Sequence, residues 1–407
     1  IPSLGNPFLQ VREEKASTQS KKLYIYTVMC NSQFMKKRAY KYRFYPTPEQ
    51  VLLLEKTFGC VRFVYNHILD FRSKQYSEKG EKIGFTQANA ALTRLKKDPE
   101  KAWLCEVSSV PLQQALRHQQ AAFTNFFEKR AGYPAFKRKN GRQSAEFTRS
   151  AFKYVNGQLF MAKSKTPLKI RWSRELPSQP STITISKDRA GRYFASMLCE
   201  FEAEKLTVTP KMVGIDLGIT HLFTRDDGQK IENPKHTSRY AARLALLQRR
   251  LSKKKLGSAN RRKAKLKVAK LHAKIVDTRQ DNLHQVSRRL INENQVICVE
   301  SLKIKNMVKN RRLAKAISDA GWGELVRQVG YKGDWAGRQV VKIDQWYPSS
   351  KKCSCCGHVM DKMPLNVRFW ICPACQAEHD RDVNAARNIR AVGLTVLACG
   401  DARRPNA

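Results

Sequence analysis

Acidic side chains are scarce in this 407-residue sequence. It contains 34 Asp and Glu residues against 77 Lys and Arg residues, which leaves a formal net charge of +43 at pH 7. A compact fold with that charge repels itself unless an outside polyanion neutralises it. Phosphate groups neutralise such a charge and release counterions, so the imbalance indicates nucleic acid as the main partner. An anionic membrane surface is the alternative.

Long apolar runs are also absent. No segment approaches the ~18 consecutive apolar residues of a membrane-spanning helix, and no secretory signal pattern opens the sequence. We therefore expect a soluble, cytoplasmic protein that does not use a membrane. Hydrophobic residues still make up 42% of the chain and aromatic residues 9%, which argues against general disorder. The length is that of roughly two to four domains.

Residues 1–34 lack any sustained periodicity and do not begin with Met. A strongly patterned segment starts at Met35. We therefore predict an N-terminal extension over 1–34, to which no role is assigned, and a tail over 396–407. The extension is expected to be dispensable.

The first patterned half alternates between strand-like and helix-like periods. Basic and aromatic residues alternate from Lys36 to Tyr45, which predicts a strand with one cationic and one packed face. Apolar residues then recur at helical spacing from Thr47 to about Arg130, before short strand-like pieces return over 145–202. We predict a β-barrel formed by 35–46 and 131–209, interrupted by a helical domain over 47–130.

The second half has an α/β pattern that a cysteine-rich segment interrupts. Apolar strand-like runs occur at 212–219, 295–301 and 339–344, with long basic helical stretches between them. We predict an α/β domain over 210–350 and 378–395, with the cysteine-rich insertion at 351–377. The fold class is thus a multidomain α+β protein.

The segment from Thr237 to Val276 contains 14 Lys and Arg residues and no acidic residue. A merely solvated helical face normally mixes both signs of charge, so this segment is interpreted as a phosphate-binding helical hairpin. A stripe of leucines should pack one face on protein. The candidate nucleic-acid contacts are Arg249, Arg250, Lys253, Lys254, Lys255, Arg261, Arg262, Lys263 and Lys267.

Four of the eleven cysteines form two C-x2-C pairs separated by fifteen residues. This spacing predicts a zinc ribbon whose four thiolates complete a tetrahedron, so the metal is structural. Its ligands are Cys353, Cys356, Cys372 and Cys375. Cys355 is a possible competing ligand, whereas His358 and His379 are interpreted as bystanders.

Three carboxylates lie at the ends of predicted elements in the α/β region. Asp216 interrupts a buried strand, Glu300 ends another, and Asp382 lies near the start of a helix. Each alone could be an ordinary turn or helix-start acid. Together, in a protein that binds polyanions, they form an oxygen-rich set suited to Mg²⁺ or Mn²⁺. Two such ions could hold the attacking and leaving oxygens of a phosphodiester.

The motifs G-I-D-L-G-I, V-I-C-V-E-S-L and H-D-R-D-V-N-A-A-R-N, with the cysteine pairs before the last, resemble those of the TnpB family. R-F-Y-P-T-P-E-Q, F-V-Y-N-H and S-D-A-G-W-G-E-L extend the resemblance from about Met35 to Val392. TnpB proteins are transposon-encoded RNA-guided DNA endonucleases related to type V CRISPR effectors. The resemblance implies an OB-like wedge barrel with a helical recognition insertion, followed by a RuvC (RNase H-like) nuclease domain.

The resemblance also implies roles for particular residues. Asp216, Glu300 and Asp382 would be the catalytic, Mg²⁺-binding triad, with one structural Zn²⁺ at the four cysteines. The implied partners are a guide RNA from the transposon end and double-stranded DNA, held by a monomeric ribonucleoprotein acting at the bacterial nucleoid. Base pairing would then read most of the target sequence. A short motif beside the target would be read by Phe85, Asn89, Ser109 and Gln113.

Three alternatives share parts of this pattern. A compact type V CRISPR effector would have the same nuclease, and a repeat array beside the gene would distinguish it. A non-cleaving RNA-guided repressor would lack one or more of the three acids, all of which are present. A transposase with three carboxylates is disfavoured because the cysteine pairs lie between Glu300 and Asp382.

Overall fold

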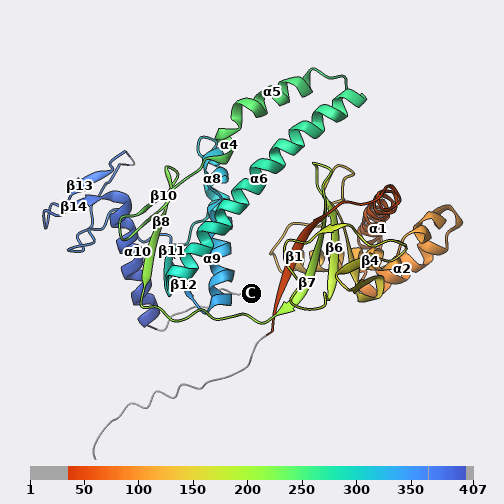
Figure 1. The fold of residues 1–407 in the computed structure, drawn as a ribbon, viewed down its shortest axis with the longest axis horizontal. Helices are drawn as coiled ribbons and strands as arrows, with labels where there is room; N and C mark the ends of the chain where they lie inside the picture. The colour runs from red at the N-terminus through yellow and green to blue at the C-terminus, as the bar shows by residue number, and fades with distance from the viewer. Residues whose placement is uncertain (1–34, 365, 400–407) are drawn as a thin grey trace, which may run out of the picture. The chain divides into compact units, whose positions relative to one another are not determined.

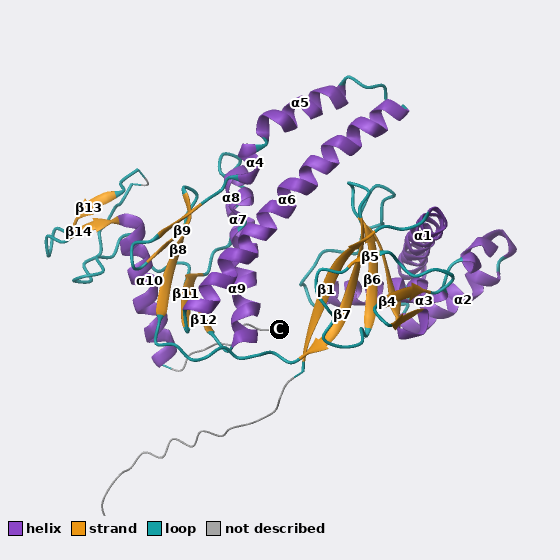
Figure 2. Cartoon of the chain, in the orientation of Figure 1, coloured by secondary structure: helices purple, strands orange, loops and turns teal. Residues whose placement is uncertain are grey.

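The computed structural model describes residues 35–364 and 366–399. The predicted extension over 1–34 and most of the predicted tail lie outside these ranges. Within them, runs of helices and runs of strands follow one another along the chain (Figure 2).

A five-stranded antiparallel sheet forms the first half, in the order β2-β6-β7-β1-β5. The strands are β1 (Lys36–Phe44), β2 (Gln143–Thr148), β5 (Ile170–Arg171), β6 (Thr182–Lys187) and β7 (Tyr193–Phe201). A short 3-10 helix, η2 (Arg149–Ala151), leads into a hairpin of β3 (Phe152–Val155) and β4 (Gln158–Met161). No ladder joins β2 to β5 within the described residues, so the observed structure is an antiparallel sheet, and its closure into an OB-like barrel stays a prediction.

Strand β1 has the predicted two faces. Tyr40, Tyr42 and Phe44 are buried, and the residues between them are exposed. Because side chains alternate across a strand, the three rings enter the core while Lys41 and Arg43 face outward.

Helices occupy the predicted stretch after this strand. They are α1 (Pro48–Lys79), α2 (Phe85–Lys97), the 3-10 helix η1 (Pro99–Glu106) and α3 (Ser109–Phe127). Helix α1 begins with a capping box, in which the Thr47 hydroxyl accepts from the Gln50 backbone N–H and the Gln50 side chain accepts from the Thr47 N–H. It ends at Gly80, which has a left-handed conformation at φ +68°.

The second half is built on a mixed sheet in the order β10-β9-β8-β11-β12. Its strands are β8 (Met212–Leu217), β9 (His221–Arg225), β10 (Lys230–Glu232), β11 (Val296–Glu300) and β12 (Gln339–Ile343). The central strand β8 pairs parallel to β11 and antiparallel to β9, and β11 pairs parallel to β12. The carboxyl ends of β8, β11 and β12 therefore meet at one edge.

Helices cover both faces of this sheet (Figure 1). On one face, α6 (Ala259–Glu293) and α9 (Trp322–Ala336) pack over Val213, Ile215 and Val299. On the other face, α10 (Arg381–Ala398) packs over β8, β11 and β12. The remaining helices are α4 (His236–Arg239), α5 (Ala241–Ser252), α7 (Ile304–Met307) and α8 (Ala314–Ala320).

Two glycines let α10 approach the sheet closely. A Cβ on Gly214 of β8 would lie 2.2 Å from the Ala386 carbonyl oxygen, and a Cβ on Gly393 of α10 would lie 2.3 Å from Cys298 Sγ of β11. Both distances are shorter than any van der Waals contact, so these positions exclude every side chain larger than hydrogen.

A small cysteine-bearing segment precedes α10. Its hairpin pairs β13 (Phe369–Ile371) with β14 (Glu378–Asp380), and its small core contains Trp370 with two of the cysteines. In the described parts of the chain, no helix combines the length and apolar character needed to cross a bilayer.

We predict that Gly214→Ala loosens α10. The added methyl group meets a backbone oxygen that cannot rotate away, so the substitution should cost about 1–3 kcal/mol. Hydrogen exchange of the α10 amides should accelerate. The matched control is Gly330→Ala in α9, where nothing lies within 4 Å of the added Cβ. Unchanged protection of α10 in Gly214→Ala would contradict this packing.

Candidate metal and nucleic-acid sites

Asp216 and Glu300 lie side by side on neighbouring parallel strands. The register pairs Ile215 with Val299, so the next residues along β8 and β11 are the two acids. Val213 and Ile215 face α6 and α9, and the period of two turns Gly214 and Asp216 toward α10. Glu300 lies two residues after Cys298 on the same strand, and Cys298 also faces α10. Both carboxylates therefore lie on the α10 face of the sheet.

Asp382 reaches the same edge from α10. It is the second residue of that helix, and its side chain is 26% exposed. The charge of Asp382 is one of the causes that raise the pKa of Asp216, so the acids of three separate elements lie near one another. The three acids do not yet form a tight cluster. Among the described residues, no choice of one carboxylate oxygen from each of the three places all three oxygens within 4.8 Å of one another.

Burial and mutual repulsion perturb these acids. Burial first, and then the charges of Glu300 and Asp382, raise the pKa of Asp216 well above its usual range. Burial also raises the pKa of Glu300, against a hydrogen bond from Ser349. Clustered, partly buried carboxylates are stabilised when a cation neutralises them, so this donor set fits a hard divalent metal ion.

Two neighbours of the acids were missed by sequence reasoning. Ser349 Oγ donates to Glu300 Oε1 at 2.5 Å, and Arg368 Nη1 lies 3.3 Å from Asp382 Oδ1. Ser349 carries no recognisable sequence signal. Arg368 could have been noticed as a basic residue directly before the strand that leads to the second cysteine pair.

Asp380 has a different role from Asp382. Its Oδ1 accepts from the backbone N–H groups of Asp382 and Val383, which makes it the N-cap of α10. Its Oδ2 pairs with Lys230 Nζ at 2.6 Å. Despite the opposing effect of burial, the Lys230 contact and these backbone hydrogen bonds lower the pKa of Asp380. Both Asp380 oxygens are thus engaged in holding the helix start, whereas Asp382 pairs with Arg368 and its charge contributes to the raised pKa of Asp216.

The four predicted cysteines form one cluster. Cys353 Sγ lies 3.7 Å from Cys375 Sγ, and Cys356 Sγ lies 3.6 Å from Cys372 Sγ. All four sulfurs fall within 4.8 Å of one another, which is close enough to hold a single metal ion. Although burial acts in the opposite direction, hydrogen bonds from the Cys356 and Cys355 backbones lower the pKa of Cys353 to about 6.

A second possible ligand group shares Cys353 with Cys355 and His379. His379 Nε2 lies 3.0 Å from Cys353 Sγ, and the ring is buried against Trp370 with centroids 4.6 Å apart. Only Cys353 belongs to both groups, and the four-thiolate set closes without the other two residues. The exposed His358 belongs to neither group.

Two buried asparagines join the cysteine segment to α10. Asn384 Nδ2 donates to the Lys352 carbonyl oxygen at 2.7 Å, and its Oδ1 accepts from the Ser354 N–H at 2.9 Å. Asn388 Nδ2 donates to the Ser349 and Lys352 carbonyl oxygens at 2.8 and 2.6 Å. The chain around Cys353 is thereby fixed to the helix that carries Asp382.

The acid-free segment folds as the predicted helical hairpin, formed by α5 and the first part of α6. Eight of the nine candidate phosphate contacts are exposed, and Arg261 is half-buried. The Arg261 guanidinium donates to the carbonyl oxygens of Leu251 and Lys254 at 3.0 and 2.8 Å, which caps the end of α5. Arg261 therefore holds the hairpin turn.

The leucines of this hairpin pack less completely than expected. No residue of α5 is buried, whereas Leu271 and Ile275 of α6 are. Apolar side chains of the two helices partly cover one another, and Leu246 remains 40% exposed.

The predicted motif-reading residues lie on two helices that pack together. Phe85 and Asn89 belong to the first turns of α2, and Ser109 and Gln113 to those of α3. The Arg117 guanidinium lies 5.2 Å from the Phe85 ring centroid, one helical turn after the exposed Gln113.

Three family profiles match the chain. One described as "Probable transposase" matches residues 196–311, and one described as "Cas12f1-like, TNB domain" matches residues 322–389. A third, described as "Helix-turn-helix domain", matches residues 35–82. In this structure that last range forms strand β1 and the single helix α1.

Two curated relatives match over most of their length. A Streptomyces pristinaespiralis protein, provisionally named an RNA-guided DNA endonuclease, is 56% identical over 91% of this chain and 92% of its own. The Escherichia coli K12 protein InsQ, named in the same way, is 31% identical over 89% of this chain and 94% of its own.

A solved structure shares the fold. The protein in a Cas12f1, single guide RNA and target DNA complex aligns over 88% of this chain and 99% of its own, with a TM-score of 0.55 and 13% identity. This likeness supports a mixed α and β architecture of the same kind.

We predict that Asp216→Asn stabilises the protein in Mg²⁺-free buffer, and increasingly so at higher pH. Because the folded-state pKa of Asp216 is raised, the folded protein binds more protons than the unfolded chain. Stability is therefore lost as pH rises from about 3.9, the ordinary Asp value, through the raised pKa. Melting temperatures between pH 5 and 8 should diverge between the variant and wild type. Exposed Glu81→Gln is the control, and a pH-independent difference would refute the raised pKa of Asp216.

Proposed function

The chain belongs to the TnpB family of transposon-encoded RNA-guided DNA endonucleases, and on this premise we propose that it cuts guide-matched DNA with Asp216, Glu300 and Asp382. The observation that carries the proposal is the convergence of these acids, from β8, β11 and α10, at the carboxyl ends of the parallel strands β8 and β11. Two whole-length relatives named for the same activity support it.

The sheet order and the position of the acids support a RuvC, RNase H-like assignment for 210–350 and 378–395. In the same proposal, 35–46 and 131–209 form the OB-like wedge, 47–130 the recognition domain and 351–377 the zinc ribbon. A guide RNA from the transposon end would pair with target DNA, and Phe85, Asn89, Ser109 and Gln113 would read the adjacent motif. The ribonucleoprotein is proposed to be monomeric and to act at the nucleoid.

The mechanism assigns each residue a task. Bound Mg²⁺ or Mn²⁺ would supply charge neutralisation and an activated water at the scissile phosphate. The three acids would hold the cations, because their burial and repulsion favour neutralisation. Ser349 orients the Glu300 carboxylate by donating to Oε1. Asp380 and Lys230 hold the start of α10, which fixes the position of Asp382. The products are proposed to carry 5′-phosphate and 3′-hydroxyl ends.

Arg368 forms an ion pair with the Asp382 carboxylate in this structure. A divalent cation held by Asp382 would be repelled by this neighbouring guanidinium. We propose that Arg368 turns away as the site is loaded.

A second candidate is a transposase, because one matching profile carries that description. Strand-transfer products on transposon-end DNA would favour it, whereas hydrolysed ends on guide-matched DNA favour the nuclease. The Cas12f1 likeness keeps a CRISPR effector as the neighbouring possibility within RNA-guided enzymes.

We predict that Asp216→Ala, Glu300→Ala and Asp382→Ala each abolish cleavage of guide-matched DNA in Mg²⁺ but change guide-dependent binding only a few-fold. Binding depends on base pairing and basic contacts, which these substitutions leave in place. Asp380→Ala is the informative neighbour, since as a lost cap it should cost about 1 kcal/mol of stability and, because Asp382 is only less well positioned, slow cutting without abolishing it. If Asp382→Ala cuts at a near-normal rate and Asp380→Ala does not cut, then Asp380, and not Asp382, is the third metal ligand.

We predict one structural zinc ion per chain at the cysteine cluster. Metal analysis of purified protein should find about one equivalent, and Cys356→Ser should lose zinc together with solubility or folding, because metal binding supplies folding energy to so small a segment. Cys355→Ser should keep its zinc, and so should Cys105→Ser, a control in another part of the fold. A protein that folds fully without zinc would overturn the assignment.

A further inference from the structure

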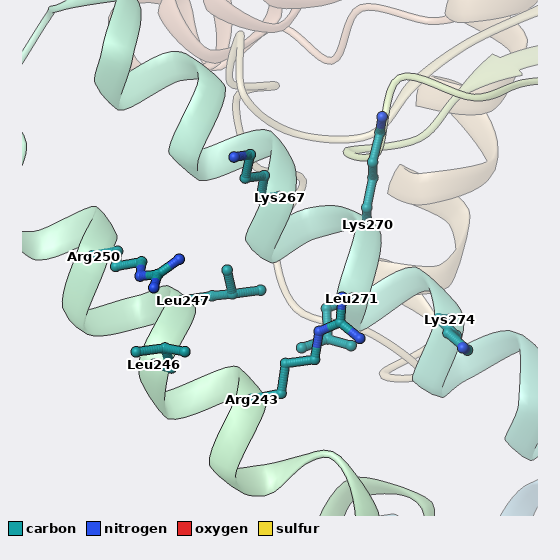
Figure 3. Close-up of a pocket in the computed structure, with 8 residues that line it drawn as sticks. All are labelled: Arg243, Leu246, Leu247, Arg250, Lys267, Lys270, Leu271 and Lys274. Carbon is teal, nitrogen blue, oxygen red and sulfur yellow. The ribbon is translucent and has the colours of Figure 1, made fainter.

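A groove runs between α5 and α6 in the basic hairpin (Figure 3). It has a volume of about 540 Å³ and is lined by three leucines and five cations. The leucines are Leu246, Leu247 and Leu271, and the cations are Arg243, Arg250, Lys267, Lys270 and Lys274. Figure 3 shows Leu247 and Leu271 pointing toward the space between the helices. The groove therefore has an apolar floor and a cationic rim.

The described residues provide no ion-pair partner for the rim cations. Across the described part of the chain, none of the five cations forms an ion pair, and the nearest named partner of Lys274 is the Tyr240 ring, 5.4 Å away. No acidic residue occurs between Thr237 and Val276. Five cations without ion pairs around one groove favour an anionic occupant with several charges.

The leucine floor indicates which form of nucleic acid fits the groove. Packed helices lie about 8–10 Å apart, whereas a DNA duplex has a major groove about 12 Å wide that itself admits a helix. A duplex would meet the rim with its phosphates and leave the leucines uncovered. An unpaired strand has phosphates on one side and base faces on the other, and base faces can cover apolar surface.

We propose that the α5–α6 groove binds an unpaired strand of nucleic acid, with phosphates on the cationic rim and base faces on the leucine floor. This inference rests on the proposed RNA-guided function and deepens it, because it names the form of nucleic acid that the hairpin takes. Guide RNA outside its paired region and a displaced DNA strand share this chemistry, so the experiment must separate them.

The test uses full-length protein and three labelled probes of equal length: single-stranded RNA, single-stranded DNA of the same sequence, and the corresponding duplex. The groove variants are the pair Lys267→Gln with Lys270→Gln, which removes charge, and Leu246→Ser, which removes apolar floor without changing charge. The matched control is Lys254→Gln with Lys255→Gln, which removes the same charge from the exposed hairpin turn.

The groove pair should weaken single-strand binding about tenfold and lower the magnitude of its salt slope by about 1.4, since each single-strand phosphate contact contributes about 0.7. Leu246→Ser should weaken single-strand binding about threefold and leave duplex binding unchanged. The turn control should affect single strands and duplex alike. The probe with the larger loss, RNA or DNA, identifies the source of the strand.

Equal losses for single strands and duplex in the groove variants would overturn the proposal, as would a turn control that matches the groove pair on every probe. If Leu246→Ser disturbs the circular dichroism spectrum, the lysine pair alone decides. Guide-dependent cleavage by wild-type protein, measured alongside, keeps the two hypotheses apart. Cleavage without groove selectivity refutes only the groove, and absent cleavage refutes the function itself.

Discussion

The docking of α10 on the parallel strands β8 and β11 is the constraint on which the candidate nuclease site depends. Two of its acids belong to the sheet and the third to the helix, so their convergence is only as accurate as this packing. Gly214 and Gly393 permit backbone and sulfur contacts that no other residue would allow. Asn384 and Asn388 then connect the same helix to the cysteine segment. One interface thereby aligns the acids, Ser349 and the candidate metal cluster.

Charge is distributed in opposite ways at the two functional surfaces. Around Asp216, carboxylates of like charge are crowded, and burial together with their charges raises the pKa of Asp216. On the α5–α6 hairpin, cations of like charge are crowded, and none of the five that line the groove forms an ion pair with a described residue. Each surface carries an electrostatic penalty in the free protein, because a compact state is destabilised by unneutralised charge of one sign. Divalent cations would relieve the first and phosphates the second, so the complete ribonucleoprotein should be the most stable form of the chain.

Much of this organisation could be predicted from local sequence patterns. Several features depend only on residues close in sequence. They are the period-two alternation in β1, the strands that contain Asp216 and Glu300, the hairpin between Thr237 and Val276, and the spacing of the cysteines. Contacts between distant segments could not be read in this way. Ser349 reaches Glu300 and Arg368 reaches Asp382 because of the fold, and Arg261 caps α5 because of the turn that it closes. The leucine-floored groove likewise requires two helices to be placed side by side.

The order of the acids along the chain has a consequence for how the enzyme is made. A ribosome delivers Asp216 first, then the basic hairpin, then Glu300, and adds Asp382 only after the cysteine segment has emerged. The basic hairpin is therefore synthesised while the proposed cutting centre still lacks one of its three acids. On that proposal, competence to cut DNA arrives last, together with the helix that covers one face of the sheet.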